Sequence, residues 1–445
     1  METGLLKVTS YLLFVLIITS CESDSNEFDV SPLDAEIDGL LLQANPEGRD
    51  AFLLPGDNKY DQLPQDPKNP ITSEKVALGK MLFHETALGN ASMRLQGART
   101  YSCASCHNAK SAMQSGRRQG IAEGGEGFGV SGEGRGMNPE YDETTVDVQP
   151  IRAPSTLNVA YQKNVLWNGM FGATGLNEGT ESKWIGDAAV NRLGFEGAES
   201  QAIKGLEVHR MSASMDMMTE FGYIDMLREA FPGVEDDTLV SRTYMGLAIA
   251  AYVRTITSSD APFQKWLRGN SAALTDQEKR GAILFFGTAN CVACHTGPGL
   301  NKMDFAAVGM ADLDGTDIIN ADPVNTSLGR GGFTGRTEDN YKFKIPQLYN
   351  LKDAPFLGHG SSIYSLEDIV KYFNEAIPQN DIPSEFIDPL FRPLGLDQSE
   401  VENLTAFLKQ GLYDPNLTRY IPDEVLSNSC FPNADEVSKA DLGCN

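Results

Sequence analysis

Basic residues are scarce in this sequence, and the shortage limits the partners that the protein can bind. The 36 lysines and arginines are outnumbered by 61 aspartates and glutamates, which gives a formal net charge of −25 at pH 7. A surface of this sign repels nucleic acid and attracts basic proteins. We therefore expect no nucleic-acid ligand, and any protein partner should be basic.

Long hydrophobic runs are also missing. The longest, Tyr11–Ile18, is too short to span a bilayer as a mature helix, and with Lys7 before it the run fits a secretory signal. The residues Ile18-Thr-Ser-Cys21 resemble a bacterial lipobox, which implies cleavage before Cys21 and a lipid on its sulfur. A plain signal peptide with an incidental cysteine is the alternative. We expect a periplasmic lipoprotein of the cell envelope, in contact with a membrane only through Cys21.

Histidine is equally rare, which limits the side chains that could ligate a metal ion. Five histidines occur in 445 residues, and two of them, His107 and His295, directly follow a pair of cysteines. Only His84, His209 and His359 remain for another ligand or for proton transfer.

Strand-like alternation is scarce, so the sequence predicts a mainly α-helical protein. Apolar residues recur at helical spacing, as in residues 238–256. Residues 120–136 hold eight glycines, which predicts a loop, and we expect this loop to be mobile. It contains a formal GxGxxG pattern at 127–132, but no strand precedes it and no helix follows, so we reject a dinucleotide site.

The six cysteines after Cys21 fall into three pairs. Cys430 and Cys444 flank a polar C-terminal tail, and because an exported protein can form disulfides, we expect these two to be bonded. The other four stand in two CxxCH motifs, Cys103-Ala-Ser-Cys106-His107 and Cys291-Val-Ala-Cys294-His295.

Three kinds of site use cysteines paired in this way. A thioredoxin-like redox pair needs a βαβ context, which is not visible, and a zinc ribbon needs two CxxC pairs about 15–20 residues apart. A c-type haem fits, because two thiols three residues apart can bond the two vinyl groups of a porphyrin and the next histidine can ligate its iron. We therefore expect two covalently bound c-type haems, held by Cys103, Cys106 and His107 and by Cys291, Cys294 and His295.

Each CxxCH motif follows the same helical pattern. One helix is predicted from a cap at Thr72 or Ser73, and the other from a capping box at Thr275; both contain Gly-x-x-Leu-Phe. This internal repeat predicts two haem domains. The expected division is a signal peptide at 1–20, an acidic linker at 21–60, an N-terminal domain at 61–270, a C-terminal domain at 271–425 and a disulfide-stapled tail at 426–445.

Residues 65–415 resemble the bacterial di-haem cytochrome c peroxidases and their MauG-type relatives. The resemblance implies two cytochrome c-like α domains with long loops. It makes the N-terminal haem, with His107 on its iron, the peroxidatic site, and it makes the C-terminal haem, with His295, the receiver of electrons. Its markers are NPITSEKVALGKMLF, Arg152-Ala-Pro-Ser-Thr-Leu-Asn158, Leu166-Trp-Asn-Gly169, Glu199-Ser-Gln-Ala202, Phe356-Leu-Gly-His-Gly360 and Ser365-Leu-Glu-Asp368.

The resemblance also suggests catalytic residues. Trp167 matches the tryptophan that carries electrons between the haems, although an ordinary buried aromatic is the alternative. Classical members have a blocking histidine soon after the first haem motif, but none occurs between His107 and His209, so the first haem is expected to be open, as in MauG. Gln201 matches a glutamine on the open side of that haem. Glu207 or His209 is the candidate for the nearby acid–base group, and His209 could instead ligate iron or lie on the surface.

Two metal positions are less regular. The family ligates the second iron with a methionine or a tyrosine from the helix after Ser-Leu-Glu-Asp. Tyr372 is the nearest candidate, strict register points to Phe373, and Met303 and Met310 are alternatives. The family also holds calcium between its domains through an asparagine whose position is Arg152 here. A guanidinium cannot ligate a cation, so calcium is either lost or held by other residues.

These features together predict a di-haem cytochrome c peroxidase. It would reduce hydrogen peroxide to water with electrons from an external donor such as a small cytochrome c. One alternative is a MauG-type enzyme that oxidises residues of a partner protein. The other is a non-catalytic di-haem electron-transfer protein, which would need strong ligands on both faces of both irons.

Overall fold

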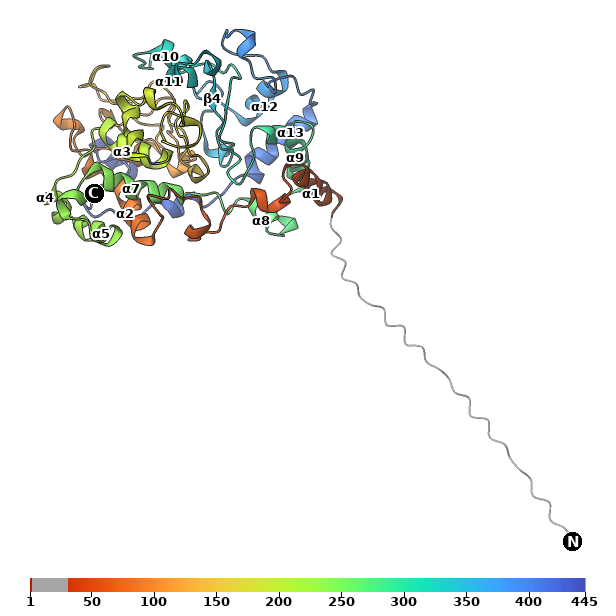
Figure 1. Ribbon diagram of the computed structural model, residues 1–445, viewed down its shortest axis with the longest axis horizontal. Helices are drawn as coiled ribbons and strands as arrows, with labels where there is room; N and C mark the ends of the chain where they lie inside the picture. Colours follow the sequence, from red (N-terminus) through yellow and green to blue (C-terminus); the bar gives the residue numbers. More distant parts are fainter. Residues whose placement is uncertain (2–30, 445) are drawn as a thin grey trace.

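The computed structural model describes Met1 and residues 31–444, drawn in Figure 1. The predicted signal peptide, the lipobox and Cys21 lie outside these residues. Within the described part of the chain, no helix has both the length and the hydropathy needed to cross a bilayer.

The described residues are mainly helical, as predicted. Two pairs of two-residue strands form the sheet structure: β1 (Gly125–Glu126) pairs antiparallel with β2 (Gly136–Met137), and β3 (Phe305–Ala306) with β4 (Phe343–Lys344). The α-helices are α1 (Pro32–Ala44), α2 (Ser73–His84), α3 (Gly197–Val208), α4 (Met215–Glu220), α5 (Tyr223–Ala230), α6 (Asp236–Leu239), α7 (Arg242–Arg254), α8 (Pro262–Leu267), α9 (Asp276–Phe286), α10 (Pro323–Ser327), α11 (Arg330–Thr334), α12 (Leu366–Glu375), α13 (Gln398–Ala406) and α14 (Glu436–Leu442). Short 3₁₀ turns and loops connect them.

Helices α2, α3 and α7 form the first hydrophobic core. Helix α2 begins after a side-chain cap from Thr72, as predicted, and its Gly79 faces α7 so closely that an added Cβ would lie 2.0 Å from the carbonyl oxygen of Ala248. Gly246 of α7 also allows a close approach to α3, because an added Cβ would lie 2.7 Å from the Cα atom of Ile203. The glycine of the first Gly-x-x-Leu-Phe motif is therefore a helix-crossing point.

Helices α1, α9 and α13 surround the second core in the same manner. Helix α9 begins at the predicted capping box of Thr275 and Glu278. An added Cβ on Gly281 would lie 2.1 Å from the carbonyl oxygen of Asn403 in α13. The repeated motif thus marks the same close crossing in each domain.

Gly281→Ala is expected to destabilise the protein by about 1–3 kcal/mol, because the new methyl group must push α13 away from α9. Gly39→Ala is the matched control, since nothing lies within 4 Å of a Cβ added to this residue of α1. Alanine favours a helix, so the control should be neutral or slightly stabilising. Chemical denaturation of both variants measures the difference. A Gly281→Ala protein as stable as the control would contradict the close crossing.

The described part of the predicted acidic linker, residues 31–60, contains a folded helix, which corrects the linker assignment for these residues. Ile37 and Leu41 of α1, with Phe52 and Leu54 after it, are buried in the second core. The apolar residues of α1 recur at i, i+4 spacing, but the surrounding acidic residues concealed this pattern. Helix α8 packs in the same core, so the chain enters the second domain before residue 262 rather than at 271.

The C-terminal tail packs on the first domain, at the opposite end of the molecule from α1 (Figure 1). The predicted disulfide between Cys430 and Cys444 is present. Asn433 pairs with Tyr101 in a β-bridge, and the hydroxyl of Ser102 donates to the carbonyl oxygen of Pro432 at 2.9 Å. The tail therefore contacts the turn that carries the first CxxCH motif.

The tail also fixes the glycine-rich loop, which corrects the expectation that this loop is mobile. The carboxylate of Asp441 accepts hydrogen bonds from the backbone N–H groups of Phe128 and Gly129, each at 2.8 Å. Arg135 is buried and pairs with Asp435 at 3.2 Å. The glycines of this loop allow its tight turns. The acidic residues that hold these turns lie in the C-terminal tail, so no local sequence pattern could predict the contacts.

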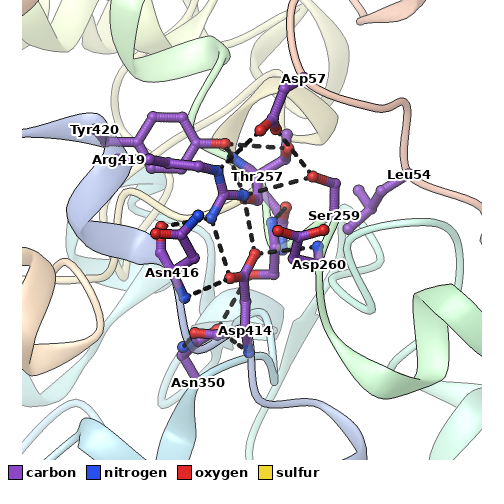
Figure 2. A network of polar contacts seen from close by, with 12 residues as sticks. Leu54, Asp57, Thr257, Ser259, Asp260, Asn350, Asp414, Asn416, Arg419 and Tyr420 are labelled. Carbon is purple, nitrogen blue, oxygen red and sulfur yellow. Dashed lines mark hydrogen bonds and ion pairs between the residues drawn. The ribbon is translucent and has the colours of Figure 1, made fainter. Parts of the chain in front are cut away.

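A polar network fixes the two connections that pass between the domains (Figure 2). Arg419 pairs with the buried carboxylate of Asp414 at 2.9 Å and with Asp57 at 3.1 Å, and it donates to the carbonyl oxygen of Thr257 at 2.9 Å. Asn350 of the second domain donates to the backbone of Asp414 at 2.7 Å. Three distant segments of the chain thus meet at one guanidinium, and Asn350 joins a fourth through Asp414.

Candidate functional site

The first CxxCH motif forms a tight 3₁₀ turn at Cys103–Ser105. The backbone N–H of His107 donates to the carbonyl oxygen of Cys103 at 3.1 Å, which places the imidazole directly after the two thiols. Nδ1 of His107 lies 3.3 Å from the carbonyl oxygen of Met113. A histidine held through Nδ1 presents Nε2 as a metal ligand.

The second motif repeats this geometry at Cys291–Ala293. The N–H of His295 donates to the carbonyl oxygen of Cys291 at 2.8 Å. Its Nδ1 lies 3.2 Å from the carbonyl oxygen of Leu300 and 3.1 Å from that of Pro346. Both histidines are therefore oriented to ligate iron through Nε2.

The four motif thiols are unbonded in the structure and suit covalent attachment better than redox exchange. Burial raises the pKa of Cys103, Cys106 and Cys291 to about 12, whereas thioredoxin-like pairs have a lowered pKa. Around the second motif, Cys294 and His295 line a cavity whose walls are largely apolar. These apolar residues include Leu348, Leu351, Leu357, Ile369 and Phe373. The thiol and imidazole donors and the apolar lining of the cavity both fit a porphyrin.

His209 lies near the first haem motif. It ends α3, and its Nδ1 is 2.9 Å from a carboxylate oxygen of Asp147. Burial lowers the pKa of His107 to about 4, and a positive charge on nearby His209 contributes in the same direction. Burial also disfavours the charged form of His209, but the charge and hydrogen bond of Asp147 outweigh it, and the pKa of His209 is raised.

Asp147 was not predicted from the sequence. It is buried on the segment that returns from the glycine-rich loop, where its backbone pairs with Ala122 and Glu123. It lies 62 residues before its imidazole partner. No sequence motif predicts a pair of residues so far apart in the chain. A single aspartate also does not stand out in a sequence with 61 acidic residues.

Gln201 and Glu207 have different surroundings on α3. Gln201 is half-buried, whereas Glu207 is exposed and pairs with Lys204 at 2.6 Å. Six residues along a helix place two side chains on different faces. The structure therefore directs Glu207 to solvent and leaves His209, at the end of α3, as the acid–base candidate.

Trp167 lies at the border of the second haem cavity. It is buried, lines the cavity, and donates from Nε1 to the carbonyl oxygen of Arg152 at 2.8 Å. Its ring meets that of His359 edge to face at 6.1 Å, and His359 stacks on Phe343 with ring centroids 3.6 Å apart. Trp167, His359 and Phe343 thus form an aromatic cluster at the border of this cavity. The hydrogen bond of Trp167 joins the cluster to Arg152, which follows the first CxxCH motif in the chain.

Tyr372 is not among the residues that line the second haem cavity, and its role as a metal ligand stays a prediction. Its hydroxyl donates to the carbonyl oxygen of Val308 at 2.6 Å, and Phe373, to which strict register with the family points, lines the cavity. Met310 also lines the cavity, whereas Met303 is not among its lining residues.

Arg152 occupies the position where the family places a calcium-ligating asparagine. Its guanidinium is buried and donates to Gln114 Oε1 at 3.0 Å and to the carbonyl oxygens of Arg117 and Ser115 at 3.0 and 3.2 Å. Burial lowers its pKa to about 10, so it keeps its charge at neutral pH. An organic cation thus lies among oxygen atoms at this position.

Comparisons with known proteins agree with this geometry. The family described as di-haem cytochrome c peroxidase matches residues 73–272. The methylamine utilization protein MauG of Methylorubrum extorquens is 28% identical over 358 residues, covering 78% of this chain and 81% of that protein. Cytochrome c551 peroxidase of Pseudomonas aeruginosa is 25% identical over 353 residues, covering 78% of this chain and 81% of that protein.

Solved structures show the same architecture. A MauG-like protein associated with microbial copper homeostasis superposes with a TM-score of 0.56 at 25% identity, covering 84% of this chain and 98% of that one. The Y463M variant of the di-haem peroxidase BthA from Burkholderia thailandensis gives a TM-score of 0.51 at 19% identity, covering 79% of this chain and 89% of that one. The second likeness concerns the fold alone.

Proposed function

Because this chain belongs to the di-haem cytochrome c peroxidase and MauG family, we propose that it reduces hydrogen peroxide to water with electrons from an external cytochrome-type donor. Each peroxide takes up two electrons and two protons and leaves as two water molecules. A haem held by Cys103, Cys106 and His107 supplies the open iron for this chemistry. The protein supplies proton transfer, electron entry and the path between the domains.

Proton transfer is assigned to His209. Cleavage of peroxide needs a group that takes the proton from one oxygen and delivers it to the other. His209 has this capacity, and the hydrogen bond to Asp147 holds Nδ1 so that Nε2 is free to act. Gln201, from the preceding turns of the same helix, orients the bound peroxide by hydrogen bonding.

Electron transfer is assigned to the second domain and Trp167. A haem held by Cys291, Cys294 and His295 would accept the electrons of the donor, and the buried indole of Trp167 would provide the path to the first domain. The strongly acidic chain favours a basic donor such as a small cytochrome c, and salt should weaken that docking.

Met310 lines the second haem cavity and would supply a further ligand to a haem bound there. A thioether at this position is the reason for preferring a peroxidase over a MauG-type enzyme. The loop around Met310 is fixed because the carbonyl oxygen of Val308 accepts from Tyr372 at 2.6 Å and that of Gly309 accepts from the N–H of Gln379 at 2.8 Å. Gly358 makes room for the thioether, since an added Cβ would lie 2.9 Å from its sulfur. Methionine raises the reduction potential of haem and so suits a cytochrome donor.

Met310→Ala is expected to leave the second iron without its sixth ligand. The second haem of the resting protein should change from low-spin to high-spin, which electron paramagnetic resonance detects. Met303→Ala is the control, because Met303 does not line the cavity. An unchanged spectrum in Met310→Ala would assign the ligand to another residue.

Steady-state turnover of the wild-type protein tests the function. Rapid peroxide consumption coupled to oxidation of a reduced basic cytochrome c, weakened by salt, is the expected result. Consumption only when a partner protein is itself oxidised would favour the MauG-type alternative. Two low-spin haems in every redox state would favour the electron carrier.

The compartment is proposed on the same grounds. The disulfide between Cys430 and Cys444 agrees with an oxidising compartment. We place the protein in the periplasm, with Cys21 as its lipid attachment point.

A further inference from the structure

Lys344 differs from the other buried lysines among the described residues. Lys279 pairs with the carboxylate of Asp34 at 2.7 Å. Lys75 donates to two oxygen atoms, those of Asn69 and the Pro70 carbonyl, each at 3.0 Å. Lys344 is 7% exposed and has no carboxylate partner within the part of the chain that the structure describes.

Among the described residues, the ammonium of Lys344 makes one hydrogen bond, and its acceptor is a neutral group. Its Nζ donates to Oε1 of Gln162, whose own Nε2 donates to the carbonyl oxygen of Ile345 at 3.0 Å. Two of the three N–H bonds of the ammonium therefore have no acceptor among the described residues. Burying an ammonium without an anion is costly, and burial lowers the pKa of Lys344 to about 7.

The other buried cations near Trp167 do not lack hydrogen-bond acceptors in this way. Arg152 and Arg330 also lack carboxylate partners, but their guanidinium N–H groups are shared among several oxygen atoms. Lys344, in contrast, lines the same cavity as Gln162 and His295, where the second porphyrin binds. The missing acceptor is thus to be sought in that cavity.

We propose that Lys344 binds a propionate carboxylate of the second haem. The assignment rests on the proposed function only in placing that haem at Cys291, Cys294 and His295. A porphyrin of this type carries two propionates, and one of them completes the hydrogen bonds of the ammonium and neutralises its charge. The backbone N–H of Lys344 also donates to the carbonyl oxygen of Trp167 at 2.7 Å, so the site joins the haem edge to the tryptophan segment.

The reduction potential of the second haem tests the proposal without any use of peroxide. In Lys344→Met the propionate charge is uncompensated and favours ferric iron. At a fixed solution potential, the ratio of oxidised to reduced second haem should rise about tenfold, which is about 59 mV for one electron. Lys344→Arg should restore most of the wild-type potential, because it keeps the charge.

Lys302→Met is the matched control for a charge lost near the same haem. Lys302 is about half exposed and pairs with Asp304, so solvent screens it and the shift should be small. A Lys344→Met shift no larger than that of Lys302→Met, or a Lys344→Arg protein as shifted as Lys344→Met, would overturn the proposal. A normal shift without peroxide turnover would instead overturn the proposed peroxidase activity.

Resonance Raman spectroscopy of the wild-type protein covers the case in which the variants fail to bind haem. The propionate-bending band of the second haem should move when the protein is transferred to D₂O, because an ammonium donor exchanges its protons. A band that does not move would show that no exchangeable donor binds that propionate, and the proposal would fall.

Discussion

Replacing His209 with alanine should slow the reaction of the resting protein with hydrogen peroxide by about 10²–10⁴-fold, the usual worth of a positioned acid–base group. His209 is the one histidine that the structure holds near the first motif with its Nδ1 fixed by a carboxylate. Stopped-flow absorption at the haem bands measures the rate directly. The spectrum before mixing shows whether the haem is intact.

Glu207→Gln is the matched control for this experiment. It changes an exposed residue on the same helix, so the reaction rate should stay at the wild-type value. If Glu207→Gln is slow and His209→Ala is fast, the assignment of the acid–base group is reversed. Equal rates for all three proteins would mean that neither residue moves the proton.

Asp147→Asn extends this test to pH. A base must be neutral to accept a proton, so activity is lost as the pH falls through the pKa of His209. Asp147 raises that pKa, and its removal should therefore move the acid limb of the rate profile to lower pH. A shift to higher pH would contradict the pairing of the two side chains.

Arg254→Met should destabilise the protein by about 3–5 kcal/mol, because it leaves the buried carboxylate of Glu199 without its cation and Glu196 with only Lys163 at 3.6 Å. Arg254 of α7 pairs with Glu199 of α3 at 2.6 Å and with Glu196 at 3.1 Å, and all three side chains are buried. Chemical denaturation of the haem-loaded protein measures the loss. Glu199 lies in α3, which carries Gln201 and ends at His209, so its ion pair with Arg254 also holds the helix of the proposed peroxide site.

Two further proteins separate charge from packing. Arg228→Met removes an exposed arginine with two acidic partners and should change stability little. The double change Arg254→Met with Glu199→Met should recover part of the loss, since it removes a carboxylate that lacks its cation. A double variant no more stable than Arg254→Met would mean that the loss reflects packing.

The sequence allowed prediction of features set by short-range signals. The caps at Thr72 and Thr275, the two CxxCH turns and the Cys430–Cys444 bond all depend on a few neighbouring residues. The Gly-x-x-Leu-Phe repeat predicted two equivalent units because both helices need glycine at a crossing.

Features set by distant partners could not be predicted. Asp147 reaches His209 only because the glycine-rich loop folds back, and that loop is held by the tail. The burial of α1 depends on a groove made by helices more than two hundred residues later.

The N-terminal helix α1 packs on the second domain, and the C-terminal tail packs on the first. This arrangement has a consequence for the order in which the two domains fold. Domains normally fold as units, and the N-terminal unit usually folds first. Here the first half waits, because Ser427 caps the buried carboxylate of Glu85 and Pro432 receives the hydroxyl of Ser102. The second half can fold earlier, since α1 is already present. The chain should therefore complete the fold around the second CxxCH motif before the fold around the first.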